Sequence, residues 1–402
     1  MAIIRPFKAI RPTRDKVHLL ASRSYLTYSD ETLKEKLENN PFTFLHIINP
    51  EYYKKTKKKG IEKFKLVKNK FINFIEQGIL FHDKKAAFYL YQQQKGEHTF
   101  QGIIAATSVE DYTNNTIKKH ENTLTKREQM FKDYLHTTGF NADPVLLAYK
   151  SSDEIRDLLA RITNTREEYN FTTTNKTQHK LWVIDDKSDS KFIINSFASI
   201  NSIYIADGHH RSASSALLAK ERTSDSSQFF MSCLIDEKQL NITNFNRLIK
   251  HLNGLTVEEF LEKIVVNYSI TKKGRKIYSP SQKNEISMYL NGSWYSLISN
   301  QTRHKTTVDA LDPSILSKNI LNPILNVKDE RTDKNISFLD GTIPLLEIKE
   351  KVDNNEFAVA FILKPIPIDA LKKVANNNEV MPPKSTYIEP KLRSGLTIYP
   401  IA

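Results

Sequence analysis

The stretch YIADGHHRSASSALLA, residues 204–219, decides how the middle of this chain folds. Residues 203–206 are apolar and mostly β-branched or aromatic, which is typical of a short buried strand, and residues 212–220 favour a helix. Gly208 lies between them and allows a tight turn. The first N–H groups of a helix have no intrahelical acceptor. The stretch therefore predicts a strand–turn–helix unit with an anion site at its turn.

Four ionisable side chains occupy this turn. Arg211 offers a planar fork that matches phosphate or carboxylate oxygens, and His209 and His210 add hydrogen-bond donors. Asp207 cannot bind an anion directly, but it suits a Mg²⁺ ion that bridges phosphates or a histidine that needs orienting. The simpler interpretation is a helix cap at Asp207 and a surface cation at Arg211. We favour a phosphate site because a cap alone does not require four such groups.

Apolar periodicity predicts a mixed α/β (α+β) fold around this unit. The segment SDETLKEKLENNP has cap-type residues at Ser29 and Asp30, and it predicts a short helix that stops by Pro41. Residues 86–108 and 285–299 each place two apolar runs around a polar turn and predict antiparallel hairpins. VLLAY, LWVID, IYIA and QFFMSCLI are expected to be short buried strands between helical stretches.

The last third of the chain continues this mixed pattern. LDPSILSKNILNPIL predicts a helix capped by Asp312 with Pro313 at its first position, and FAVAFILK predicts a buried strand. We place domain boundaries near residues 110 and 240. This gives an N-terminal α+β region (1–110), a central region with the DGHHR motif (111–240) and a C-terminal α+β region with the MPPKSTY loop (241–402).

Cysteine content and hydropathy restrict the class of protein. The chain has 402 residues and a single cysteine, Cys233, which excludes a disulfide framework and fits a reducing compartment. The apolar run before Arg5 and Pro6 is too short for a signal-peptide core, and no run reaches the roughly 18 apolar residues of a membrane span. We therefore expect a cytoplasmic protein without a membrane partner.

The formal net charge of +13 raises the question of a polyanionic partner. Its densest source is KKTKKKGIEKFKLVKNK, residues 54–70. An apolar stripe at helical spacing predicts an amphipathic helix that ends at Gly78, and the stripe consists of Phe64, Val67, Phe71 and Phe74. A solvated lysine face is the simpler interpretation. Nucleic acid is the alternative, and no arginine-rich or glycine-aromatic element supports it.

The DGHHR motif followed by a helix resembles the signature of the ParB and sulfiredoxin-like superfamily, and in particular its free-serine kinases. The whole chain resembles domain-of-unknown-function family 1015 in the segments RPFKAIRP, NPFTFLHIINPE, IKKHENT, IADGHHR, LDPSIL and EVMPPKSTYIEPKLRSGLTIYP. The resemblance implies a ParB/sulfiredoxin-like central unit with additional antiparallel sheet elements. It also implies phosphoryl transfer between a nucleotide, ADP or ATP, and the hydroxyl of serine. The carboxylate of Asp207 adds Mg²⁺ as the expected cofactor.

Two departures from the superfamily narrow the chemistry. In sulfiredoxins a reactive cysteine follows the last glycine of the motif, whereas this chain has His209 there and its only cysteine lies in an apolar, strand-like run. Sulfinic acid repair is therefore excluded. The partition proteins use an arginine-rich form of the turn followed by a helix-turn-helix, and this sequence has neither. Among the activities of the superfamily, phosphoryl chemistry on a small molecule is the one that these departures leave.

A second group of candidate residues lies in IKKHENTLTKREQ, at a helix start with Asn122 or Thr123 as cap. A serine kinase needs a carboxylate to accept the hydroxyl proton, and Glu121 is our candidate for that general base. An ordinary acid in a first helical turn is the alternative. His120 and Lys126 are candidates for phosphate binding.

The C-terminal segment MPPKSTYIEPKLRSG gathers cations and hydroxyls in a non-helical loop. We expect it to bind phosphate or carboxylate through Lys384, Ser385, Thr386, Lys391 and Arg393. A structural loop is the alternative. ASRSYLTY near the start offers a weaker set that a turn explains about as well, namely Ser22, Arg23, Ser24 and Tyr25.

These residues together predict a phosphotransferase that acts on serine or O-phosphoserine. In this hypothesis Mg²⁺, held partly by Asp207, neutralises the phosphates, and Glu121 exchanges a proton with the hydroxyl oxygen. The phosphoryl group is held by His209, His210 and Arg211. The direction of transfer stays open, and a phosphoserine phosphatase would use the same site. The rival from another class is a ParB-like nucleotide-binding or nucleic-acid adaptor protein.

Overall fold

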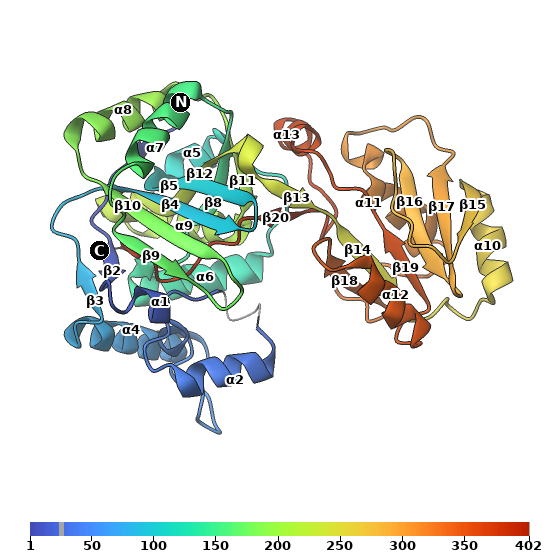
Figure 1. Cartoon of the computed structure of the whole chain (residues 1–402), viewed down its shortest axis with the longest axis horizontal. Helices are drawn as coiled ribbons and strands as arrows, with labels where there is room; N and C mark the ends of the chain where they lie inside the picture. Colours follow the sequence, from blue (N-terminus) through green and yellow to red (C-terminus); the bar gives the residue numbers. More distant parts are fainter. Residues whose placement is uncertain (24–27, 402) are drawn as a thin grey trace. The chain divides into compact units, whose positions relative to one another are not determined.

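The computed structural model describes residues 1–23 and 28–401, so the candidates Ser24 and Tyr25 lie outside the described part (Figure 1). The chain divides into two compact units. The first unit comprises Met1–Lys119, Thr123–Leu240 and Pro390–Ala402, and the second comprises His120–Asn122 and Asn241–Glu389. The sequence regions 1–110, 111–240 and 241–402 remain a prediction, because these units are defined by contacts rather than by order along the chain.

A nine-stranded mixed sheet forms the centre of the first unit. Its strands are β1 (Ile4–Arg5), β4 (Phe88–Lys95), β5 (His98–Ser108), β6 (Ile117–Lys118), β8 (Val145–Tyr149), β9 (Tyr169–Thr172), β10 (Gln178–Ile184), β11 (Ile203–Asp207) and β12 (Phe229–Asp236). Their order is β6-β11-β8-β12-β5-β4-β10-β9, with β1 paired to β5. β11 is parallel to β6 and β12 is parallel to β8, and the other pairs are antiparallel.

One apolar cluster joins this sheet to four helices, which are α5 (Val109–Thr113), α7 (Asp153–Thr163), α8 (Lys187–Ala198) and α9 (His209–Glu221). Ile203 and Ile205 of β11 are fully buried in it, and Ala216 of α9 packs against the same cluster. Burial of this apolar area is the main favourable term in folding. It holds β11 and α9 in place, and so it also positions the turn between them.

A second apolar cluster of the first unit joins its N-terminal helices to the end of the chain. It contains residues of α1 (Val17–Leu20), α3 (Leu45–Ile48) and α4 (Gly60–Glu76), together with Phe140 and Ile398. Two short antiparallel ladders support it, β2 (Ile10–Pro12) with β3 (Leu80–His82) and β7 (Phe140–Asn141) with β21 (Tyr399–Pro400). The segment after Pro390 is therefore an integral part of the first unit.

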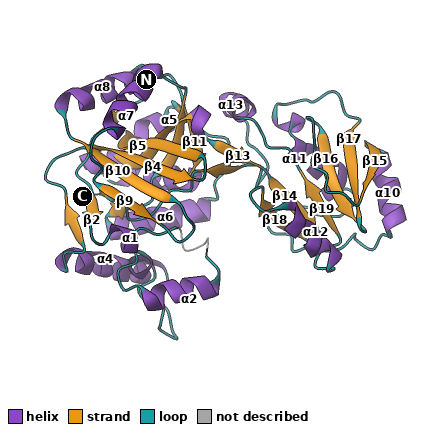
Figure 2. Cartoon of the chain, viewed as in Figure 1, coloured by secondary structure: helices purple, strands orange, loops and turns teal. Residues whose placement is uncertain are grey.

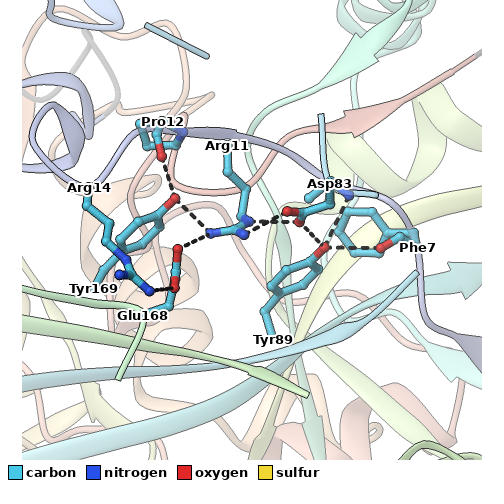
Figure 3. A network of polar contacts seen from close by, with 9 residues as sticks. Phe7, Arg11, Pro12, Arg14, Asp83, Tyr89, Glu168 and Tyr169 are labelled. Atoms are coloured by element: carbon cyan, nitrogen blue, oxygen red, sulfur yellow. Dashed lines mark hydrogen bonds and ion pairs between the residues drawn. The ribbon is translucent and has the colours of Figure 1, made fainter. Parts of the chain in front are cut away.

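A buried ion-pair network lies beside these ladders (Figure 3). Arg11 donates two hydrogen bonds to Asp83, of 2.7 and 2.6 Å, and one of 2.8 Å to the Tyr169 hydroxyl. Glu168 accepts from Arg11 at 3.3 Å and from Arg14 at 2.6 Å. The Arg11 side chain is 6% exposed and that of Asp83 10% exposed. Burial opposes the charge of Arg11, but Asp83 outweighs it and raises the guanidinium pKa above its usual value.

The second unit contains a six-stranded antiparallel sheet of order β15-β17-β16-β19-β14-β18. These strands are β14 (Phe245–Ile249), β15 (Tyr268–Gly274), β16 (Glu285–Leu290), β17 (Ser293–Ser299), β18 (Ile336–Asp340) and β19 (Val359–Ile362). Its two apolar clusters include residues of α10 (Val257–Val265) and α11 (Asp312–Leu316) in one, and of α12 (Leu345–Asp353) in the other. The unit also holds α13 (Ile368–Asn376) and the ladder of β13 (Asn241–Thr243) with β20 (Tyr387–Glu389).

Both units mix helices and strands, as the sequence predicts (Figure 2). The hairpins are β4–β5 and β16–β17, and Asn291 and Gly292 have φ angles of 44° and 70°, as a two-residue hairpin turn requires. The predicted first helix is α2 (Asp30–Asn39), whose cap residue Ser29 accepts from the Thr32 N–H at 3.2 Å. The lysine-rich helix α4 buries Val67, Phe71 and Phe74 and ends at Glu76.

Two predicted helix caps are wrong. The helix α6 (Thr125–Thr138) is preceded by Leu124 at its N-cap without a side-chain cap bond, and the Thr123 hydroxyl donates to Glu128 instead. Asp312 is the first residue of α11 rather than its cap, and its carboxylate accepts from the Asn284 N–H at 3.1 Å. In both cases a tertiary or cross-turn partner competes successfully with the local cap.

No helix within the described ranges has both the length and the apolar character needed to cross a membrane.

Candidate functional site

The turn between β11 and α9 has the backbone geometry that the sequence predicts. Gly208 is the N-cap of α9 and has a φ angle of +106°, a conformation that side chains disfavour. A Cβ atom at this position would lie 3.0 Å from three atoms of the Arg211 guanidinium. Glycine is thus needed here both for the turn and for the close approach of Arg211 to the backbone.

Two cations converge on Asp207 at this turn. Its Oδ2 atom accepts a hydrogen bond of 2.5 Å from Arg211 Nη2, and its Oδ1 atom accepts one of 3.0 Å from Lys391 Nζ. The other terminal nitrogen of Arg211 donates to the Pro144 carbonyl. Burial would raise the pKa of Asp207, but Lys391 and Arg211 outweigh it and lower the pKa to about 2. Asp207 is therefore ionised at neutral pH, and the three side chains together carry an excess positive charge.

The two histidines of the motif lie in the first turn of α9. His209 is 5% exposed and packs inward, whereas His210 is half-buried. Burial is the main cause that lowers the pKa of His210, and the nearby charge of Arg127 on α6 adds to it. Within the described residues, the buried Nδ1 atom of His210 has no hydrogen-bond partner. A neutral imidazole with one unused ring nitrogen can donate or accept a hydrogen bond, depending on its tautomer.

The end of the chain supplies Lys391 and a separately bound arginine. The Lys391 carbonyl accepts from Gln93 Nε2 at 3.2 Å, which holds this segment against β4. Arg393 is 7% exposed and donates to the Thr173 hydroxyl at 3.1 Å and to the Asn175 side-chain oxygen at 3.3 Å. Burial lowers its pKa. Lys391 thus joins the cluster around Asp207, whereas Arg393 donates hydrogen bonds to the β9–β10 turn.

Several predicted residues belong to the second unit. His120 is 3% exposed, and burial lowers its pKa to about 4. The Ser385 hydroxyl donates to the Pro382 carbonyl at 2.7 Å, and Lys384 lies over the Phe245 ring, 4.9 Å from its centroid. Thr386 is half-buried beside them, and Glu121 is exposed. The roles assigned to these residues, and to the exposed Lys126 of α6, remain predictions.

Comparison with known proteins identifies the family. The family model DUF1015, described as a protein of unknown function, matches residues 4–314. The chain belongs to this family. No curated protein matches the chain.

Three solved structures show partial likeness to this DUF1015 chain. A free serine kinase in complex with AMP is 13% identical with a TM-score of 0.40, over 73% of this chain and 92% of that one. SbnI with a C-terminal truncation, from Staphylococcus aureus, is 13% identical with a TM-score of 0.38, over 73% and 87%. A conserved hypothetical protein from Pyrococcus furiosus is 14% identical with a TM-score of 0.35, over 72% and 91%.

The DUF1015 chain does not offer Mg²⁺ the ligand set that the sequence suggested. Both carboxylate oxygens of Asp207 already accept from cationic side chains. In the described ranges, no group of three or more His, Cys, Asp and Glu side chains is placed to hold a metal ion. Asp207 as arranged here therefore fits the orientation of Arg211 and Lys391 rather than metal binding.

Sequence reasoning named Lys391 but did not connect it to Asp207, from which it is separated by 184 positions. It also missed the Pro144 carbonyl and the charged pair Arg127 and Glu128 that faces His210 in this DUF1015 chain. In the sequence, the only local indication of the site was the turn at Gly208 within the DGHHR motif. Contacts over such separations depend on how β8, α6 and the C-terminal segment pack around β11.

Proposed function

We propose that the chain is a phosphotransferase of the serine and O-phosphoserine class, with its phosphoryl site at the β11–α9 turn. The observation that carries this proposal is the convergence of Arg211 and Lys391 on the single carboxylate of Asp207. The cluster lies at the N-terminus of a 13-residue helix. The helix dipole and the excess cation both favour an anionic group, such as a phosphoryl group. The choice of serine as the partner rests on the resemblance of the DGHHR motif.

In this proposal Asp207 is a positioning residue. Its carboxylate holds the Arg211 fork and the Lys391 ammonium in place before a ligand arrives, so little reorganisation is needed when charge develops on the phosphoryl oxygens. The first N–H groups of a helix have no intrahelical acceptor, so the start of α9 can offer further donors. His210 contributes a neutral donor. Any divalent cation in the reaction is part of the nucleotide substrate.

The transfer itself forms one bond and breaks one. In the kinase direction the serine hydroxyl oxygen bonds to the terminal phosphorus of the nucleotide, and the bond from that phosphorus to the bridging oxygen breaks. The hydroxyl proton passes to a carboxylate, for which Glu121 remains our candidate. In the reverse direction the same groups transfer phosphate from O-phosphoserine to a nucleotide or to water.

Phosphorus NMR of the purified full chain tests the proposal. Four mixtures are followed: serine with ATP, serine with ADP, O-phosphoserine with ADP, and O-phosphoserine alone, each with Mg²⁺. We expect a phosphoserine signal to form or to disappear in at least one of them. Arg211→Lys should suppress the change, whereas Lys263→Gln on α10 serves as a control that alters a charge in the second unit. Absence of any transfer or phosphate release by folded protein would reject the proposal.

A further inference from the structure

The second unit contains a cleft that the proposed function does not use. Its volume is about 800 Å³, and it lies between the loop 304–312 and the segment 364–379, which includes α13. Sites for small molecules typically have volumes of about 300 to 1,000 Å³. The cleft is therefore large enough for a metabolite of the size of a nucleotide.

Four exposed lysines line this cleft, namely Lys283, Lys305, Lys364 and Lys373. In the part of the chain that the structure describes, none of them forms an ion pair with an acidic side chain, and Lys364 donates to the Ser281 carbonyl at 2.9 Å. Like charges gathered in a concave surface focus the field and attract anions. The four lysines repel one another, so without an anionic ligand a wider spacing of these charges would be more favourable.

The two carboxylates of the cleft do not cancel this charge. Glu379 accepts from the backbone N–H groups of Val308 and Thr307, at 2.8 and 3.4 Å, and so holds the loop. Asp312 is 8% exposed and accepts from Asn284, and it is attracted by Lys283 and Lys364 without reaching ion-pair distance. The cleft keeps an excess of two positive charges when four lysines are set against these two carboxylates.

The remaining lining adds an apolar wall and an unused polar atom. Leu311 and Ile366 are buried, and prolines 365 and 367 on either side of Ile366 restrict the backbone of that wall. Within the described ranges, the buried Nδ1 atom of His304 has no hydrogen-bond partner. A buried polar atom without a hydrogen bond destabilises the fold unless a ligand or a water molecule forms that bond. The lining thus combines cations, one unsatisfied polar group and apolar surface.

We propose that this cleft binds a phosphorylated metabolite with an apolar body, such as a nucleoside phosphate. The phosphates would lie among the lysines, and the apolar body would lie against Leu311 and Ile366. This site is independent of the phosphoryl site at the β11–α9 turn, because every residue of its lining belongs to the second unit.

Lysine footprinting on the unmodified full chain tests this inference. The protein is acetylated briefly with and without ADP, pyrophosphate or sodium sulfate at matched ionic strength, and the modified lysines are quantified by mass spectrometry. We expect ADP to reduce acetylation of Lys283, Lys305 and Lys373 by about 5-fold or more, since a bound phosphate covers their amines. Lys263 and Lys276, exposed in the same unit but outside the cleft, should react as before.

The outcomes separate this inference from the proposed function. If sulfate protects the lysines as well as ADP does, the protection is only charge screening and the proposed site is wrong. If pyrophosphate protects them equally, the apolar part of the ligand makes no contribution and that part of the proposal is wrong. Protection of Lys391 alone would place ADP at the β11–α9 turn and reject the cleft. Calorimetry gives a second measurement: Lys283→Gln with Lys305→Gln should weaken ADP binding about 10-fold, whereas Lys263→Gln with Lys276→Gln should not. Catalytic activity does not enter either readout.

Discussion

Two of the arginine–aspartate pairs in the first unit have the same chemistry but differ in burial, in hydrogen bonding and in charge balance. The pair of Arg11 and Asp83 is almost fully buried, and the surrounding tyrosines and Glu168 complete its hydrogen bonds (Figure 3). The pair of Arg211 and Asp207 is exposed by 26% and 39%, and Lys391 adds a second cation to it. In the first network the positive charges of the arginines are balanced by the carboxylates of Asp83 and Glu168. The second has spare charge and access to solvent.

This difference leads to different expectations for the two pairs. A buried pair has to satisfy all its donors and acceptors internally, because an unpaired buried charge is strongly destabilising. A half-exposed cluster with excess charge gains little stability from its pairs, and its arrangement agrees with the anion site that we propose there. Five predictions test this comparison.

Removal of Arg11 should have the largest effect. Arg11→Met leaves the buried Asp83 without its partner, and we expect the free energy of unfolding to fall by about 3 to 5 kcal/mol. Urea denaturation followed by circular dichroism measures the loss. The double variant Arg11→Met with Asp83→Asn should recover part of it, because no buried charge remains. A loss below about 1 kcal/mol would show that the network is not the structural element described here.

Arg211→Lys should instead lower activity strongly and stability only slightly. It keeps the positive charge but loses the fork, so the rate of phosphoryl transfer should fall by about 10- to 1,000-fold, or roughly 1.4 to 4 kcal/mol. Stability should change by less than about 1 kcal/mol, because the pair is partly exposed. Steady-state kinetics and urea denaturation provide the two numbers.

The variant His210→Asn, combined with Arg211→Lys, tests whether His210 and Arg211 hold the same phosphoryl group. If they do, the loss of rate in the double variant should be smaller than the sum of the single losses. Small and additive losses would identify the DGHHR turn as a structural turn without a shared ligand.

The titration of Asp207 gives a smaller but more direct signal. Its folded pKa of about 2 lies below the ordinary value of 3.8. The ionised form thus stabilises the fold above about pH 4, and this contribution is lost as the pH falls through about 2. Lys391→Met should raise the pKa of Asp207 towards the ordinary value, as measured by carbon-detected NMR. An unchanged pKa would mean that Lys391 does not contact Asp207 in solution.

The exposed lysines that directly precede α4 should contribute least. Replacement of Lys57, Lys58 and Lys59 by glutamate should leave turnover and stability nearly unchanged, within about 0.5 kcal/mol, because solvent screens exposed charges. A filter-binding assay with DNA and RNA accompanies the kinetics. A large loss of turnover would show that this surface belongs to the site, whereas nucleic-acid affinity that depends on these lysines would favour the adaptor hypothesis.

The elements of this chain were largely predictable, because they depend on local patterns. The apolar stripe of α4, the cap at Ser29 and the Asn291–Gly292 turn each involve residues a few positions apart. The caps proposed at Thr123 and Asp312 were not predictable in the same way. Their side chains have better partners in Glu128 and in the backbone of Asn284, the second of which is 28 residues away.

The sequence by itself determined the strand–turn–helix unit and the chemical character of its turn. Gly208 is required there because its φ angle is positive and Arg211 approaches it closely, and the ionisable residues that follow are adjacent along the chain. Only the tertiary structure decided that Lys391 pairs with Asp207, that Arg393 binds the β9–β10 turn instead, and that four lysines share a cleft in the second unit. The physical reason is range: backbone conformation follows from neighbouring residues, whereas the charge balance of a site follows from whichever distant segments the packed cores bring together.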